Sequence, residues 1–148
     1  MNTHPYLRAF LSGLFVPTLI MPLLLTVFIV VRLGLQWPFP IERGLVFPMA
    51  LVPGLWGLWS MLWLRSHELT HLPLGIHGAL LPFLLLPAGA VVAKYSGVVN
   101  FESSSVFWFN AVHIPYAVFA VGFLAGITVY YLVWKYIVGF LNRVLGIA

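Results

Sequence analysis

The sequence predicts an all-α integral membrane protein: a bundle of four transmembrane helices with proline kinks and short loops. Three observations carry this prediction. The 148 residues are 62% hydrophobic and only 7% charged, whereas a soluble domain is about 25% charged. The apolar residues form long continuous runs, unlike the alternating segments of about ten residues in membrane β-barrels. The connections between runs are short, which favours antiparallel neighbours in an up-down-up-down order.

The chain divides into expected spans within one membrane domain, residues 1–148. About 20 apolar residues cross the hydrocarbon core as a helix. The first three uncharged runs fit one span each, at residues 9–31, 44–64 and 72–93. The first run is longer than the apolar region of a signal peptide, which has about 7–15 residues, so we expect it to be retained as a span.

The fourth uncharged run, residues 103–134, is too long for one crossing and is divided by Pro115. We therefore place the fourth span at residues 115–134. We interpret the preceding residues 106–114 as an interfacial or re-entrant segment.

The positions of the basic residues predict an orientation. With four spans both termini lie on one side, and short cytoplasmic loops tend to carry the excess of Lys and Arg. Four basic residues lie on the side of the termini and three on the other: Arg8, Arg65, Lys135 and Arg143 against Arg32, Arg43 and Lys94. This difference of one charge places both termini in the cytoplasm, and we expect a bacterial inner (plasma) membrane.

Prolines and glycines inside the spans have two interpretations each. Three spans contain two prolines five residues apart, at positions 17/22, 48/53 and 82/87. Each proline removes a backbone donor, so the helices either break around a polar cavity, as in carriers, or curve for packing. Gly122 and Gly126 form a GxxxG pattern, which permits close helix approach; we expect it first inside the bundle and otherwise in a dimer.

Composition excludes several function classes. The absence of Cys excludes disulfides and thiol chemistry. The net charge of +4 is spread singly at the ends of apolar runs, so it forms no basic stripe for nucleic acid. No Asp, Glu, Lys or Arg lies inside an expected span, which argues against proton- or cation-coupled transport. The expected partners are the lipid bilayer and either other membrane subunits or a homo-oligomer.

One polar cluster carries a chemical hypothesis. His67-Glu68-Leu69-Thr70-His71 matches the H-E-x-x-H motif. Two His four residues apart on one helical face can bind one Zn²⁺, with the Glu as general base on a metal-bound water. His77 would supply the third ligand. The cluster therefore predicts zinc held by His67, His71 and His77, with Glu68 as the catalytic base.

The same spacing resembles the metzincin signature, HExxHxxGxxH, in which the third His lies ten residues after the first. The resemblance covers only His67–His77. Glycine stands at Gly75 rather than at position 74, and no Met follows Met61 to form that family's downstream turn. We read the likeness as shared spacing and not as membership. The alternative without a metal is a wetted loop at the membrane surface, in which the negative charge of Glu68 compensates the positive charge of Arg65.

A second set of residues suggests a ligand pocket. Trp56, Trp59 and Trp63 recur on one helical face, which either packs on a neighbouring helix or contacts a flat ligand. At the opposite rim, Asn110 and His113 would contact a polar ligand or water. We therefore take Trp56, Trp59, Asn110 and His113 as the candidate pocket residues.

Two function classes follow. The first is a non-enzymatic membrane module, either a subunit of a membrane complex or a binder or carrier of a lipophilic molecule. The second is a membrane-embedded metal-dependent hydrolase that uses residues 67–77. We favour the first, because the second rests on eleven residues.

Overall fold

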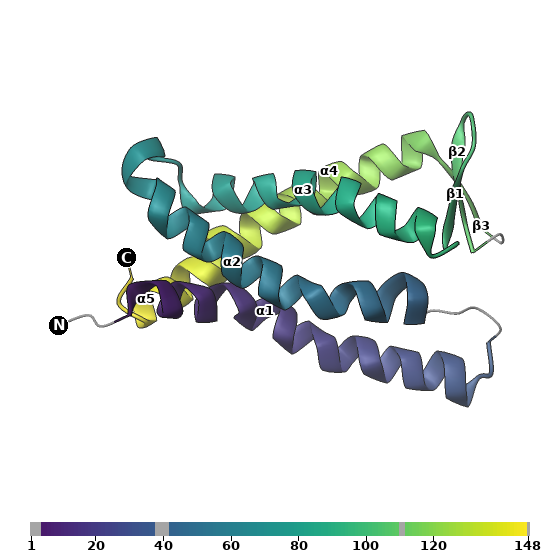
Figure 1. Cartoon of the computed structure of the whole chain (residues 1–148), viewed down its shortest axis with the longest axis horizontal. Helices are drawn as coiled ribbons and strands as arrows, with labels where there is room; N and C mark the ends of the chain where they lie inside the picture. The colour runs from purple at the N-terminus through teal and green to yellow at the C-terminus, as the bar shows by residue number, and fades with distance from the viewer. Residues whose placement is uncertain (1–3, 38–41, 110–111, 148) are drawn as a thin grey trace.

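The computed structural model describes residues 4–37, 42–109 and 112–147. Four long helices dominate this part of the chain (Figure 1), so the predicted helix count is confirmed. They are α1 (Pro5–Phe28), α2 (Phe47–Thr70), α3 (Leu74–Tyr95) and α4 (Tyr116–Leu132). Shorter helical segments extend them: the π-helical η1 (Ile29–Gly34), η2 (Glu42–Val46) and η3 (Val133–Val138), and the α-helical α5 (Gly139–Val144).

Within the described residues, three continuous helical stretches are long and apolar enough to cross a membrane. These stretches are Pro5–Gly34, Leu74–Tyr95 and Tyr116–Val144. Helix α2 is as long as α1 but is not among them, and its last turns carry Arg65 and Glu68. The expected span ended at residue 64, but the helix continues to Thr70, so the alternative of a wetted loop over these residues is wrong.

Prolines set where two of the helices begin. Pro73 and Pro115 have extended backbone angles and immediately precede the first residues of α3 and α4. This position suits proline, because its ring disfavours helix in the residue before it. The internal prolines at positions 17, 22, 53, 82 and 87 do not end their helices.

The helices form two hairpins that diverge. Helix α1 packs along α2, and α3 packs along α4 and η3, whereas α2 and α3 contact each other much less. Figure 1 shows the hairpins close together at the end that holds both termini and apart at the opposite end. We call these the closed end and the open end of the bundle. At the closed end, Arg8 Nη1 donates to the Leu145 carbonyl over 3.1 Å. Both termini of the described chain therefore lie on one side of the bundle.

The hydrophobic core joins the two hairpins near the closed end. Trp56 of α2, Leu81 of α3, and Trp134 and Val138 of η3 are buried in one cluster. The Trp56 and Trp134 ring centroids are 5.5 Å apart in a tilted arrangement. Gly78 leaves room for Trp134, because a Cβ at that position would overlap the indole. This contact fixes η3 against the start of α3.

A three-stranded antiparallel sheet lies at the open end, so the expectation of an all-α chain is wrong in this segment. Its strands are β1 (Val99–Phe101), β2 (Ser105–Trp108) and β3 (Val112–Pro115), in the order β1-β2-β3. The register pairs Phe101 with Val106 and Val106 with Ile114. The segment interpreted as interfacial or re-entrant, residues 106–114, supplies most of β2 and most of β3. Its β-branched and aromatic residues favour strands.

The sheet is held on the first turn of α4. The Tyr116 hydroxyl donates to the Glu102 carbonyl over 2.7 Å, and the Tyr116 N–H donates to the Ser104 carbonyl over 3.3 Å. Ser105, which is fully buried, donates from Oγ to Glu102 Oε2 over 3.3 Å. The β1–β2 turn is therefore attached to the helix that follows the sheet.

Candidate functional site

The H-E-x-x-H segment lies at the end of α2. His67 is still helical, but His71 has left the helix in a left-handed conformation, with φ of 50°. The His71 N–H donates to the His67 carbonyl over 2.9 Å and closes the last turn. Because His71 is no longer helical, the two imidazoles lose the i, i+4 face that a shared metal requires. The His67 ring instead lies against Trp63, with centroids 4.9 Å apart.

The third predicted ligand, His77, is engaged elsewhere. It is buried in the first turn of α3, 5% exposed, and stacks on Trp59 with centroids 4.8 Å apart. His77 Nε2 lies 3.1 Å from the Trp59 carbonyl oxygen, and Trp59 Nε1 donates to the His77 carbonyl over 2.9 Å. A carbonyl accepts only, so Nε2 carries the proton in this contact and does not offer a lone pair to a metal.

The structure therefore does not bring the predicted zinc ligands together. Across residues 4–37, 42–109 and 112–147, no three His, Asp or Glu side chains are grouped so that they could hold a metal ion. His67, Glu68 and His71 are exposed at the end of α2, while His77 holds α2 and α3 together through Trp59. In this arrangement the residues do not fit a three-ligand zinc site.

The tryptophan face of α2 packs against protein. Trp56 is buried against Trp134 and against Tyr130, whose ring centroid is 5.0 Å away. Trp59 faces His77, and Trp63 is buried and donates to the Leu72 carbonyl over 3.4 Å. Of the two interpretations of this face, packing on a neighbouring helix and contact with a flat ligand, the structure shows the packing.

The other two predicted pocket residues belong to the opposite end. His113 lies in β3, is exposed, and has Nε2 3.8 Å from Glu102 Oε2. Asn110 lies outside the described residues. His113 and the α2 tryptophans therefore do not line one pocket.

A cavity that the sequence did not indicate lies between the diverging hairpins. Its deeper part has a volume of about 370 Å³ and is bounded by α2, α3 and α4. Its outer part, about 330 Å³, continues toward the sheet. Both parts are lined by Pro48 of α2 and by Leu85, Leu86 and Gly89 of α3, so they form one groove. We call it the inter-hairpin groove.

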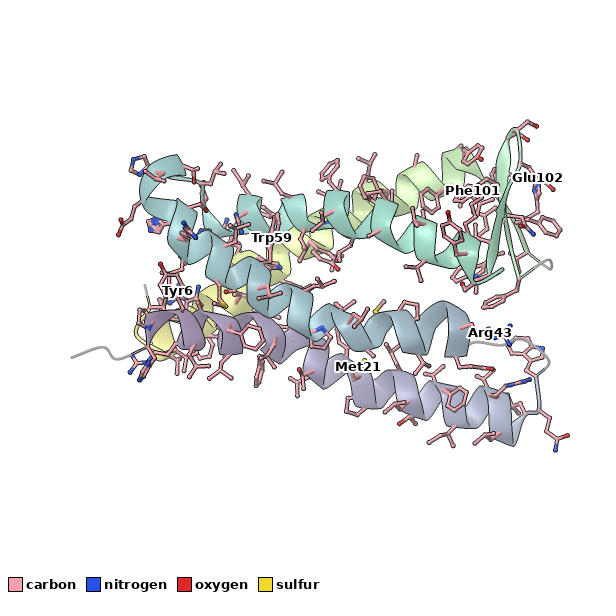
Figure 2. The ribbon with its side chains drawn as sticks, viewed as in Figure 1. Tyr6, Met21, Arg43, Trp59, Phe101 and Glu102 are labelled. Atoms are coloured by element: carbon pink, nitrogen blue, oxygen red, sulfur yellow. The ribbon has the colours of Figure 1, made fainter. Side chains whose placement is uncertain are left out.

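The lining of the inter-hairpin groove is almost wholly apolar. Val52 and Leu55 line its deeper part from α2, and Phe123 and Tyr130 line it from α4. The outer part is lined by sheet residues and by one charged residue: Phe101, Val106, Trp108, Ile114 and Arg43. Figure 2 shows Arg43 and Phe101 at the same end of the molecule, on opposite sides of the opening between the hairpins. The groove can hold an apolar chain with a polar end at the sheet.

Small residues on α3 keep the groove open. Ala88 and Gly89 face it, and a Cβ added at Gly89 would meet no atom within 4 Å. In the sequence this stretch reads Pro87-Ala88-Gly89-Ala90, and such a run of small residues is common in membrane helices and does not by itself indicate a groove. The void arises because α2 diverges from α3, which the local sequence does not encode.

A buried polar cluster at the closed end was also missed. Ser12 of α1, Ser60 of α2 and Asn142 of α5 are all essentially unexposed. Ser12 Oγ donates to Asn142 Oδ1 over 2.6 Å and lies 3.4 Å from Ser60 Oγ. Because Ser12 and Asn142 are 130 residues apart, these bonds tie the C-terminal helix to the first hairpin. Their role is structural.

The GxxxG of α4 does not make the close contact expected inside the bundle. A Cβ at Gly122 or Gly126 would meet no atom within 4 Å. A close approach to a neighbouring helix backbone is found instead at Gly13 of α1, where a Cβ would lie 2.5 Å from the Trp56 carbonyl oxygen.

Comparisons with known proteins found no match to the chain among family models, curated proteins or solved structures.

Proposed function

We propose that the protein is an integral membrane protein that binds a lipophilic molecule in the inter-hairpin groove. The groove is the observation that carries this proposal. Its deeper part, about 370 Å³, falls within the range of about 300–1,000 Å³ typical of ligand sites. Its lining offers dispersion contacts and almost no hydrogen bonds, which suits a hydrocarbon chain and excludes a sugar or a nucleotide.

The outer surface of the helices supports a lipid environment for this activity. Large apolar side chains are exposed along the bundle, among them Leu23, Val121 and Leu124, each at least 64% exposed. Monomeric soluble proteins rarely expose contiguous apolar patches of more than a few hundred Å². A bilayer satisfies this surface and also supplies lipophilic molecules to a groove that opens between helices.

Binding without catalysis is the activity that the groove supports. Among the described residues that line its deeper part, Tyr130 carries the only ionisable group, and there is no His, Asp, Glu, Lys or Ser side chain to act with it as an acid, base or nucleophile. The protein therefore acts as a binder or carrier of a lipophilic molecule and not as a hydrolase.

A substitution that fills the groove tests the proposal. Gly89→Leu places an isobutyl side chain in the groove without a steric clash at Cβ, because no atom lies within 4 Å. Gly54→Leu is the matched control: its Cβ also meets no atom within 4 Å, and Gly54 does not line the groove. Both changes replace a helical glycine by a better helix former.

The measurement is the amount of lipid that remains on the chain after purification in mild detergent, determined by solvent extraction and mass spectrometry. We expect about one lipophilic molecule per chain in the wild type and in Gly54→Leu, and several-fold less in Gly89→Leu. Equal retention by all three proteins would refute binding in the inter-hairpin groove.

A further inference from the structure

The charge at the mouth of the inter-hairpin groove indicates what kind of molecule enters it. Arg43 of η2 is the charged residue in the groove lining, and its side chain is exposed. The remaining lining on the opposite side is apolar, from Phe101, Trp108 and the end of α3. An arginine in this position can lay its apolar stem along the groove and keep its guanidinium at the polar boundary.

Arg43 has no carboxylate partner within the described residues. The chain contains three acidic residues, Glu42, Glu68 and Glu102. Glu42 faces Arg32, with Oε2 3.8 Å from Nε, and Glu102 faces His113. Glu68 lies near the opposite end of α2. With no carboxylate from these parts of the chain beside it, the guanidinium of Arg43 is available to an anionic group from outside.

The length of the groove matches one leaflet of a bilayer. Its lining on this side runs from Arg43 to Leu55, which spans at most about 18 Å, the length at the α-helical rise of about 1.5 Å per residue. Half of a hydrocarbon core of about 30 Å is about 15 Å. A molecule seated with its polar end at Arg43 would therefore extend its apolar part close to the midplane.

We propose that the occupant of the inter-hairpin groove is a membrane phospholipid with a net negative head group, whose phosphate pairs with Arg43 while an acyl chain fills the apolar lining. This inference rests on the proposed function and adds the head-group charge to it. Planar guanidinium groups match phosphate oxygens and form charge-assisted hydrogen bonds. A zwitterionic head group brings its own cation to the phosphate and gains less from Arg43.

The test compares two lipids with identical acyl chains, anionic phosphatidylglycerol and zwitterionic phosphatidylcholine, in competition for the full chain in a nonionic detergent. Bound lipid is counted by native mass spectrometry. We expect the wild type to prefer phosphatidylglycerol by about tenfold, equivalent to 1.4 kcal/mol. Arg43→Gln should bind both lipids about equally. Lys94→Gln removes a positive charge from the end of α3, outside the groove lining, and should keep the preference.

Two further samples separate the possible failures. Free glycerol phosphate should not displace the bound lipid, because without an acyl chain it lacks the apolar contacts; displacement at the lipid's own concentration would overturn the assignment to a membrane lipid. If Gly89→Leu binds both lipids as the wild type does, the proposed function itself fails. Two other results would refute only the role of Arg43, provided that Gly89→Leu loses lipid. One is a wild type without a preference for phosphatidylglycerol, and the other is an Arg43→Gln variant that keeps this preference.

Discussion

The close contact between α1 and α2 at Gly13 gives a sharp prediction about stability. A Cβ at this position would lie 2.5 Å from the Trp56 carbonyl oxygen, 2.7 Å from Ser60 Cβ and 3.0 Å from the Trp56 carbonyl carbon. Favourable contacts between carbon atoms need about 3.5–4.0 Å. The Gly13→Ala variant can therefore fold only if the two helices move apart by about 1 Å, because two of the three atoms belong to backbone.

The expected cost follows from this displacement. Overpacking a well-packed core typically costs about 1–3 kcal/mol, whereas alanine in place of glycine favours a helix by up to about 1 kcal/mol. Separating the helices also stretches the contact of 3.4 Å between Ser12 Oγ of α1 and Ser60 Oγ of α2. We expect a net loss of about 1–3 kcal/mol in the free energy of unfolding, or about 3–10 °C in Tm for a chain of this size.

Thermal unfolding in detergent, followed by tryptophan fluorescence, measures this loss. Gly54→Ala is the control, since it makes the same chemical change in a helix where a Cβ meets no atom within 4 Å; its Tm should equal or slightly exceed that of the wild type. If Gly13→Ala is as stable as Gly54→Ala, α1 and α2 do not pack backbone against backbone at this point, and the reasoning is refuted.

Two other predictions concern buried and exposed polar groups. Ser12→Ala leaves the buried Asn142 Oδ1 without its donor and should lower the free energy of unfolding by about 1–3 kcal/mol. Denaturant titration of Ser12→Ala, Asn142→Leu and the double variant should show a coupling energy of at least about 0.5 kcal/mol. Strict additivity of the two single changes would contradict a direct bond. His77→Ala removes the group that faces the Trp59 carbonyl and should cost about 1–3 kcal/mol, whereas the exposed pair His67→Ala/His71→Ala should change stability by less than about 0.5 kcal/mol and leave lipid retention unchanged. A large loss in that pair, reversed by added zinc, would return the cluster to consideration as a metal site.

The sequence predicted the helices well because their signal is local. The uncharged runs and the positions of Pro73 and Pro115 are properties of neighbouring residues, and they match the starts of α3 and α4 to within two residues. The expectation that both termini lie on one side follows from an even number of antiparallel helices and agrees with the contact of Arg8 with Leu145. Which side of a membrane this is stays a prediction.

The sheet was missed because its strands are very short. Strand β1 has three residues, and β2 and β3 have four each, too few to show a two-residue period inside an apolar run. The stretch from Val106 to Trp108 reads equally well as the start of an apolar helix. The pairing that decides between them is tertiary, since β1 and the Tyr116 hydroxyl hold these residues in place.

The predicted zinc ligands do not come together in the structure, and the reason is also tertiary. The H-E-x-x-H spacing implies one continuous helical face, but α2 ends at Thr70, within the motif. Nothing in residues 67–71 reveals that His77 packs on Trp59 of the preceding helix. A motif gives the spacing of potential ligands, whereas the helix end and the neighbouring helix decide whether they meet.

The inter-hairpin groove depends on still less local features. It exists because Trp56, Leu81 and Trp134 join the hairpins at one end, while the hairpins lie apart at the other end (Figure 1). The angle between two hairpins is set by these distant contacts, so no window of sequence contains it. Arg43 was recognised only as a flanking charge, and its place at the mouth of the groove became visible from the fold.

The most direct test of lipid binding in the groove is a density map of the protein in lipid bilayer discs, with a bound antibody fragment to aid alignment. We predict elongated density between α2 and α3, with its polar end beside Arg43 and its apolar part against Leu85, Leu86 and Gly89. A map in which α2 packs directly on α3 along its whole length, with side chains filling the space between them, would contradict lipid binding in the groove.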